Sequence, residues 1–243
     1  MARLLSAVAR LLAVLALPLL FTGTAVRFLF TWPPLYEYAL TRYQIADRTG
    51  IAPDDLQRAS QALIAYFSND DPTVNLMVTQ RGVVRPLFSE REVLHLVDVK
   101  ALVRLFVRLQ ELALVALVLL AGLALWRARG AALPAIGAVL GWGSALTLAL
   151  LAGLVVLALV DFDQLFLQFH LLSFRENDFW LLDPRQHNLI ALFPPPFWFD
   201  ATLLLALVIG LQALIVAVVG WQVRRLAVVS PPRPAAPAER PLA

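Results

Sequence analysis

The sequence contains no cysteine and little charge. Its 243 residues include 20 Lys and Arg and 17 Asp and Glu, for a formal net charge of +3. Without cysteine the chain can form no disulfide, thiolate nucleophile, cysteine-ligated zinc site or iron–sulfur cluster, and cysteine usage does not indicate its compartment. The small net charge is not typical of a nucleic-acid-binding protein. These shortages exclude several classes of protein before any motif is considered.

Apolar residues are abundant instead. Sixty per cent of the chain is hydrophobic, whereas only 15% is charged. A single soluble domain of this length has too little interior to bury so much apolar surface, because the buried fraction rises only slowly with size. The composition therefore excludes both an ordinary cytosolic protein and a disordered chain. It predicts a polytopic membrane protein.

Four apolar segments are long enough to cross a bilayer, whose hydrocarbon core of about 30 Å needs roughly 20 helical residues. They are 8–30, 110–126, 131–160 and 201–223. The first resembles a signal peptide because Arg3 precedes an apolar run. That run continues to Phe30 without a small-residue cleavage site, which predicts a retained anchor. The second is short but continues a helical pattern that begins at Ser89.

We therefore predict an all-α membrane bundle of four transmembrane helices, with a small mixed α/β outer domain between the first two spans. In that domain Pro53 begins a helical pattern, and alternation from Val74 with a turn at 80–82 predicts a hairpin. The resulting division is 1–30 for the N-terminal segment and first span, 31–100 for the extracytoplasmic domain, 101–127 and 128–160 for the next spans, 161–200 for an aromatic extracytoplasmic loop, 201–223 for the last span and 224–243 for a disordered tail.

The arginines that flank the spans predict the orientation. Under the positive-inside rule, short loops rich in Lys and Arg face the cytoplasm. One side of the four-span arrangement carries eight arginines and a single acid, Glu239. Both termini are therefore expected in the cytoplasm. The arginines are Arg3, Arg10, Arg127, Arg129, Arg224, Arg225, Arg233 and Arg240.

Three histidines lie in the two outer regions and are the side chains suited to proton exchange near neutral pH. Ser89 and Glu92 form a capping box that fixes the start of the helix carrying His95. If this helix continues to Trp126, His95 lies roughly 46 Å from that residue, at the outer headgroup surface. Arg91 and Asp98 lie on the same helical face as His95.

The other two histidines differ in their setting. A straight helix from Pro134 would carry His170 roughly 54 Å from the inner face, several ångström higher than His95. A bend at 161–163 is therefore needed if the two imidazoles are to meet. His187 follows Pro184 in a loop, and we interpret it as a solvated residue.

Further along the second span, Arg104, Arg108 and Glu111 fall on one stripe, within or at the edge of the membrane. Charges at that depth are costly unless they pair or line a polar cavity, so they often mark a functional face. We expect the stripe to face the bundle interior or a substrate groove. The alternative is snorkelling, with an Arg108–Glu111 ion pair that closes a helix contact.

The residues alone allow several kinds of chemistry. In the first, one histidine is a general base and the other is oriented by a carboxylate, Asp98 or Asp178, for reaction of a lipid ester. In the second, His95, Asp98 and His170 bind a metal, although no HExxH motif supports it. Serine catalysis has no GxSxG motif in its favour. A non-enzymatic scaffold or lipid-binding protein is the alternative of another class.

Three motifs resemble a known family. They are FSEREVLHLVDVK at 88–100, FHLLSFRENDFWLLDP at 169–184 and LIALFPPPFW at 189–198. With the order of spans and outer regions, they are similar to the lipoprotein intramolecular transacylases, which are four-span bacterial membrane proteins. The resemblance implies transfer of the sn-2 acyl chain of an S-diacylglyceryl-cysteine to the amino group of the same cysteine, at the outer leaflet. It also implies that His95 and His170 are the catalytic pair.

The implied reaction is compatible with the residues present. An α-amine with a pKa near 8 is partly neutral, so it needs a base for its proton but no nucleophile from the enzyme. The expected partners are diacylglyceryl-modified lipoproteins and membrane phospholipid, without nucleic acid, cofactor or metal. Arg91, Arg175, Asn177 or the second histidine could stabilise the oxyanion. The candidate substrate-binding residues are Arg91, Asp98, Arg104, Arg108, Arg175, Asn177, Asp178 and Trp180.

Overall fold

Four long helices dominate the computed structural model, which describes residues 2–229, without the side chains of 2–5, 129 and 228–229. They are α1 (Ala2–Phe30), α5 (Glu90–Ala128), α6 (Leu133–Val160) and α9 (Pro195–Val229). Each is long and apolar enough to cross a membrane, which confirms the four predicted spans. α9 continues to Val229, so 224–229 are helical rather than part of a disordered tail. The rest of the predicted tail, 230–243, lies outside the described residues.

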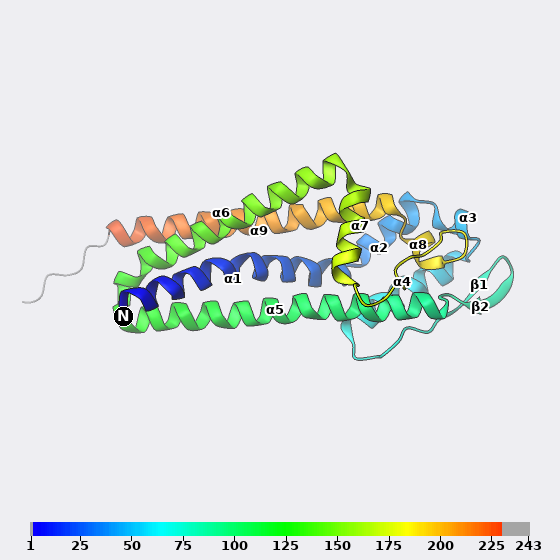
Figure 1. Cartoon of the computed structure of the whole chain (residues 1–243), viewed down its shortest axis with the longest axis horizontal. Coiled ribbons are helices and arrows are strands. Elements are labelled where there is room, and N and C mark those ends of the chain that lie inside the picture. Colours follow the sequence, from blue (N-terminus) through cyan, green and yellow to red (C-terminus); the bar gives the residue numbers. More distant parts are fainter. Residues whose placement is uncertain (1, 230–243) are drawn as a thin grey trace, which may run out of the picture.

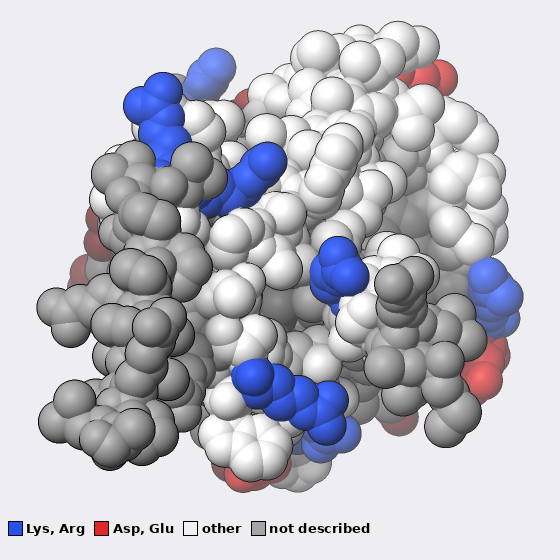
Figure 2. Space-filling view, turned by 90° about the vertical axis from the view of Figure 1, so that its left-hand side faces the viewer, with Lys and Arg blue, Asp and Glu red and all other residues white. Residues whose placement is uncertain are grey.

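The four helices form an elongated bundle with two unlike ends (Figure 1). One end holds the start of α1, the end of α9 and the turn η1 (Arg129–Ala132) that joins α5 to α6. Figure 2 looks at this end and shows basic side chains spread over it, while the acidic side chains that are visible lie at the edges of the view. The small α/β region and the segment between α6 and α9 lie at the opposite end. The fold thus has the two-sided arrangement on which the predicted orientation depends.

α1 packs inside the bundle as an integral helix, as expected of a retained anchor. Its Leu17 and Phe21 are buried in one apolar cluster with Ile209 of α9. At Gly23, a Cβ atom would lie 2.5 Å from the Phe106 carbonyl oxygen of α5, so only glycine permits this contact. Without a hydrophobic driving force inside lipid, such close small-residue contacts stabilise the association of membrane helices.

The small domain, residues 31–89, contains three helices and one hairpin. They are α2 (Pro33–Arg42), α3 (Ile45–Thr49), α4 (Pro53–Ser68), β1 (Met77–Gln80) and β2 (Val83–Pro86). The hairpin is confirmed but is shorter than the alternation from Val74 suggested. Its two-residue turn has positive φ at both Arg81 (52°) and Gly82 (80°), the backbone that suits a tight hairpin. Helices α2 and α3 were not predicted.

The two regions that sequence analysis separated share one hydrophobic core. Leu192 of α8 (Asn188–Leu192) and Phe197 at the start of α9 belong to the same buried cluster as the small domain. The small domain and the segment 161–200 therefore fold against each other. The remaining buried members of this cluster are Tyr36, Ala39, Ile45, Ile51, Leu56, Ala59, Leu63, Tyr66, Val74, Val78, Leu87, Phe88, Leu96 and Phe193.

The bend predicted at 161–163 is present. Asp161 leaves the helical conformation (φ −156°, ψ 91°), which ends α6 and begins α7 (Phe162–Ser173). Its carboxylate accepts a hydrogen bond from the Gln164 N–H at 2.9 Å and so caps the new helix. α7 then lies across the bundle and reaches toward α5 (Figure 1). This change of direction brings His170 to the level of His95.

Candidate active site

His95 of α5 and His170 of α7 lie next to each other, although 74 residues separate them in the chain. Their ring centroids are 6.0 Å apart and their planes are inclined by 32°. Both side chains are buried, with relative exposures of 7% and 8%. The sequence-based prediction that these two imidazoles converge on one place therefore agrees with the structure.

Aromatic rings enclose the histidine pair. Phe174 contacts both imidazoles, with centroid distances of 5.1 Å to His95 and 5.6 Å to His170. Phe166 and Trp180 pack on His170 at 4.4 Å and 5.1 Å. Such surroundings disfavour a charged imidazolium, because few groups there replace its hydration. Burial accordingly lowers the pKa of His170, and its hydrogen bond to Phe166 opposes that effect.

The hydrogen bonding of the two imidazoles differs. The His170 Nδ1 atom lies 2.8 Å from the Phe166 carbonyl oxygen, one helical turn earlier. Since a carbonyl can only accept, Nδ1–H donates, and the lone pair of a neutral ring is then on Nε2. The His95 Nδ1 atom is buried and has no hydrogen-bond partner among the residues that the structure describes. The His170 imidazole is thus oriented by a hydrogen bond, whereas the Nδ1 atom of His95 remains available for one.

The carboxylates predicted to orient a histidine do something else. Asp98 of α5 accepts a hydrogen bond from the Asn177 side-chain amide at 2.9 Å. Asp178 forms an ion pair with Arg91 at 3.1 Å, and its backbone carbonyl also accepts from that guanidinium. The prediction that Asp98 or Asp178 orients a histidine is therefore wrong, because the Phe166 carbonyl does so.

These polar contacts fasten the segment 174–181 to α5. Asn177 serves both sides, since its amide binds Asp98 while its carbonyl oxygen accepts from the Phe179 N–H at 3.1 Å. The fastened segment includes Phe174 and Trp180, two of the rings that enclose the histidines. Arg91, Asp98, Asn177 and Asp178 thus stabilise the wall of the site through contacts with one another.

Glu92 has a larger role than its sequence motif indicated. The capping box is confirmed: its carboxylate accepts from the Ser89 N–H at 2.7 Å, and the Ser89 hydroxyl oxygen accepts from the Glu92 N–H at 3.4 Å. Its other oxygen accepts from the Leu189 N–H at 2.7 Å, which joins the start of α5 to the start of α8. The side chain is 1% exposed and lies one turn before His95. No sequence signal pointed to Leu189 as its partner.

The remaining candidates are not equally close to the pair. Trp180 lies against His170, as described above, whereas Arg175 is exposed one residue beyond Phe174 and makes no hydrogen bond or ion pair within the described part of the chain. His187 is half-buried, and its Nδ1 accepts from the Asp183 N–H at 2.9 Å. Among the described residues, no group of three or more His, Asp or Glu side chains is placed to hold a metal ion. The alternative ligand set of His95, Asp98 and His170 is therefore not assembled.

Arg104, Arg108 and Glu111 lie on the opposite side of α5 from the histidine. Arg104 follows His95 by nine positions, which at about 100° per residue turns the side chain by about 180° and moves it about 13 Å along the axis. We call Arg91, His95 and Asp98 the histidine face, and Arg104, Arg108 and Glu111 the arginine face. The structure does not bring the second set together with the first.

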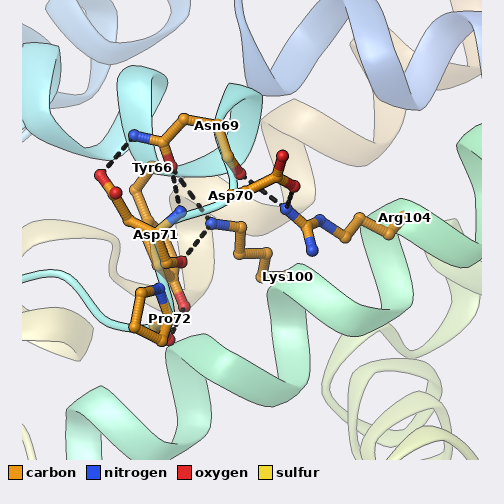
Figure 3. Close-up of polar contacts among 7 residues, drawn as sticks. All are labelled: Tyr66, Asn69, Asp70, Asp71, Pro72, Lys100 and Arg104. Atoms are coloured by element: carbon orange, nitrogen blue, oxygen red, sulfur yellow. Dashed lines mark hydrogen bonds and ion pairs between the residues drawn. The ribbon is translucent and has the colours of Figure 1, made fainter.

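The arginine face lines a cavity of about 520 Å³ between α1, α5 and the end of α4. Glu111 forms a loose ion pair with Arg27 of α1 at 3.7 Å, not with Arg108 as the alternative interpretation supposed. Arg104 donates to the Asn69 carbonyl at 2.7 Å and to Asp70 at 2.6 Å, as Figure 3 shows. The stripe therefore faces a groove at the side of the bundle rather than the bundle interior.

The fold and the histidine site together define a polytopic membrane protein with two imidazoles buried next to each other. Comparison with known proteins narrows this class. The family described as lipoprotein intramolecular transacylase Lit matches residues 11–198, and the chain belongs to this family. No curated protein matches the chain.

Solved structures show the same fold. The lipoprotein intramolecular transacylase Lit from Bacillus cereus is similar with a TM-score of 0.79 at 20% identity, over 93% of this chain and 99% of that one. Two variants of the same Bacillus cereus protein, with a histidine replaced by arginine or by alanine, each give a TM-score of 0.75 at 20% identity. They cover 93% of this chain and 95% and 96% of theirs.

Proposed function

We propose that this protein transfers the sn-2 acyl chain of an S-diacylglyceryl-cysteine lipoprotein to the α-amino group of the same cysteine. The observation that carries the proposal is the convergence of His95 and His170, 6.0 Å apart and buried among aromatic rings. Family membership supports lipoprotein acyl transfer as the general activity. The product is a lyso-form lipoprotein with an acylated N-terminus.

The reaction requires two proton movements and no covalent enzyme intermediate. The amine nitrogen attacks the sn-2 ester carbonyl and forms the new N–C bond. The tetrahedral intermediate then collapses, the sn-2 C–O bond breaks, and the glyceryl oxygen leaves with a proton. The amine loses one proton and the glyceryl oxygen gains one, so a base and an acid balance the exchange. Since both reacting groups belong to one substrate, the main task of the site is to hold them together.

The two imidazoles suit these two tasks. We assign the base to His170, because its Nδ1–H is held by the Phe166 carbonyl and leaves the Nε2 lone pair for the amine proton. We assign to His95 the stabilisation of the oxyanion and the relay to the glyceryl oxygen of the proton that His170 took from the amine. Its Nδ1 has no partner among the described residues, so it can bind a substrate atom without losing an existing hydrogen bond. Arg175, exposed one residue beyond Phe174, is a second candidate donor for the oxyanion.

The proposed location of the reaction is the outer leaflet of the bacterial cytoplasmic membrane. The arginine-rich end of the bundle in Figure 2 would face the cytoplasm, with both termini there. The histidine pair and the small domain would then face outward. A reporter active only in the cytoplasm should work when fused after Arg225 and fail when inserted near Asp70. The opposite result would overturn this orientation.

Mass spectrometry of a diacylated test lipoprotein measures the proposed activity directly. Cells that express the wild-type chain should convert the diacylglyceryl form to the N-acylated lyso form, at unchanged total mass. His95→Ala and His170→Ala should leave the substrate unconverted, while His187→Ala, the matched control outside the pair, should convert it. No conversion by the wild type would favour a non-enzymatic lipid-binding protein. Loss of an acyl chain as free fatty acid, sensitive to a chelator, would favour a metal-dependent hydrolase.

A further inference from the structure

The cavity on the arginine face has the features of a separate binding site. Its lining holds three guanidinium groups, from Arg27, Arg104 and Arg108, against two carboxylates, Asp70 and Glu111. It lies on the side of α5 that is turned about 180° from His95. None of its lining residues takes part in the contacts around the histidine pair, so it lies outside the site described above.

The three arginines are not equally occupied by protein groups. Arg104 uses one terminal nitrogen, Nη2, for its bonds to the Asn69 carbonyl and to Asp70. The Arg27–Glu111 pair is loose at 3.7 Å, and both side chains are more than half exposed. Arg108 lines the cavity and has no ion pair or hydrogen bond within the part of the chain that the structure describes. The Arg108 guanidinium is therefore available to bind a ligand.

The neighbouring cation on α5 is a lysine, and its ammonium group is by contrast occupied by contacts with the protein. Lys100, one turn before Arg104, donates to the Asp71 carbonyl at 2.7 Å and to the Asn69 side chain at 3.3 Å. Its ammonium also lies 3.9 Å from the centre of the Tyr66 ring. Figure 3 shows this cluster, in which the Lys100 ammonium points toward Asn69 and Asp71 and the Arg104 guanidinium points toward Asp70.

The depth of Arg108 indicates what the ligand contacts. It lies 18 residues before Trp126 on α5, or about 27 Å along the axis, close to the far edge of a hydrocarbon core of about 30 Å. Helical side chains lean toward the helix N-terminus, which on α5 is the end away from Trp126. The guanidinium is therefore carried outward to the level where lipid phosphates lie.

The surface below Arg108 is suited to acyl chains. Leu112, Val115 and Leu119 continue the same side of α5 at helical spacing, and each is more than half exposed in the protein alone. The cavity itself mixes the arginines with apolar residues, among them Phe30 and Val107. A group with a phosphate above and hydrocarbon below fits both parts of this surface.

From these observations we propose that the cavity binds a phosphate group through Arg108, with Arg104 and Arg27 beside it. A guanidinium presents two parallel N–H donors to phosphate oxygens, which gives both strength and orientation. The phosphate would be that of a phospholipid headgroup or a free anion. The apolar stripe below the cavity favours the lipid. This site goes beyond the proposed acyl transfer and does not depend on it.

Native mass spectrometry of the full chain in detergent tests the site without any activity measurement. Phosphatidylglycerol should bind at least tenfold more tightly than diacylglycerol with the same acyl chains, which lacks only the phosphate headgroup. Arg108→Gln should weaken phosphatidylglycerol binding roughly tenfold, the loss expected for one charged donor, and leave diacylglycerol binding unchanged. Arg108→Lys, which keeps the charge but not the fork, should give an intermediate loss. Arg85→Gln on the exposed strand β2 is the matched control and should bind like the wild type.

Competition with inorganic phosphate distinguishes a phospholipid headgroup from a free anion as the ligand. If millimolar phosphate displaces phosphatidylglycerol and Arg108→Gln weakens phosphate binding, the site recognises the anion alone. If phosphate does not compete, the lipid is the ligand. The proposal is overturned if phosphatidylglycerol and diacylglycerol bind equally, or if Arg108→Gln retains wild-type affinity for both phosphate-containing probes.

Discussion

The two faces of α5 place their ionisable groups in opposite environments. On the histidine face, His95 and His170 are buried among aromatic rings, and the carboxylates nearby bind Asn177 and Arg91 instead of an imidazole. On the arginine face, the guanidinium groups line an open cavity, and Arg108 has no ion-pair partner among the described residues. A general base must be unprotonated before it reacts, whereas a group that binds an anion must keep its positive charge. One helix provides both environments by presenting different sides to different neighbours.

The largest effect is expected from removing the histidine pair. His95→Ala and His170→Ala should each reduce the rate of acyl transfer by roughly 10² to 10⁴-fold, as is typical for loss of a general acid or base. The double variant should be little slower than either single variant, because groups that act as a unit are not additive. Purified protein and a synthetic diacylated lipopeptide provide the rates. Independent, multiplicative losses would show that the two imidazoles do not share one reaction.

The next effect concerns the residue that fixes the start of α5. Glu92→Ala leaves the Ser89 N–H and hydroxyl and the Leu189 N–H without their acceptor, and should lower the free energy of unfolding by about 3 kcal/mol. Thermal unfolding in detergent measures the change. Glu90→Ala is the control, because Glu90 is exposed two residues earlier on the same helix. Equal midpoints for the two variants would contradict the role given to Glu92.

The pH dependence of the acyl-transfer rate should report the protonation of His170. A base must be unprotonated, and burial lowers the pKa of His170 below its ordinary 6.5, so protonation inactivates it only at lower pH. Between about pH 6.5 and 7.5 the logarithm of the rate should rise with a slope close to one, from the substrate amine of pKa near 8, and the further loss from His170 should begin only below that range. A histidine with an ordinary pKa would raise that slope toward two below pH 6.5. Rates across this range, corrected for unfolding, distinguish the two.

The smallest effect is expected on the arginine face. Glu111→Ala removes the loose ion pair with Arg27, and a pair that open is worth less than about 1 kcal/mol. The yield of folded protein by size-exclusion chromatography should fall by less than twofold, yet more than for Glu37→Ala in the small domain. The difference arises because Arg27 then lacks its counter-ion near the membrane, where unpaired charge is costly. Indistinguishable yields would show that the pair contributes nothing.

Much of the fold was predictable because its signals are local. Apolar length predicted the spans, the capping box predicted the start of α5, and the mismatch in height between the two histidines predicted the bend at Asp161. The angle between the two faces of α5 was also available from residue spacing, but sequence analysis listed Arg104 and Arg108 with Arg91 and Asp98 as substrate-binding residues of one site. Helices α2 and α3 were missed because they carry little apolar periodicity of their own.

Other parts of the site could not be predicted from sequence. The group that orients His170 is a backbone carbonyl, and every residue has one, so no residue type marks Phe166 for that role. The partner of the Glu92 carboxylate is likewise a backbone N–H, 97 residues away. Asp98 and Asp178 were assigned to a histidine because carboxylates often orient imidazoles. Their preference for Asn177 and Arg91 depends on how the segment 174–181 packs against α5.

The core shared by the small domain and α8 has a consequence for the timing of synthesis. Leu96 and Leu192 belong to one buried cluster, yet the ribosome makes them 96 residues apart. At about 5–20 residues per second, the earlier half waits roughly 5–20 s for its partner. During that interval its apolar face lacks the residues that cover it, while the second and third spans are made and before the fourth is in place. A ribosome that stalls between α7 and α8 would therefore hold a chain in which His95 and His170 are already synthesised but the small domain has not closed.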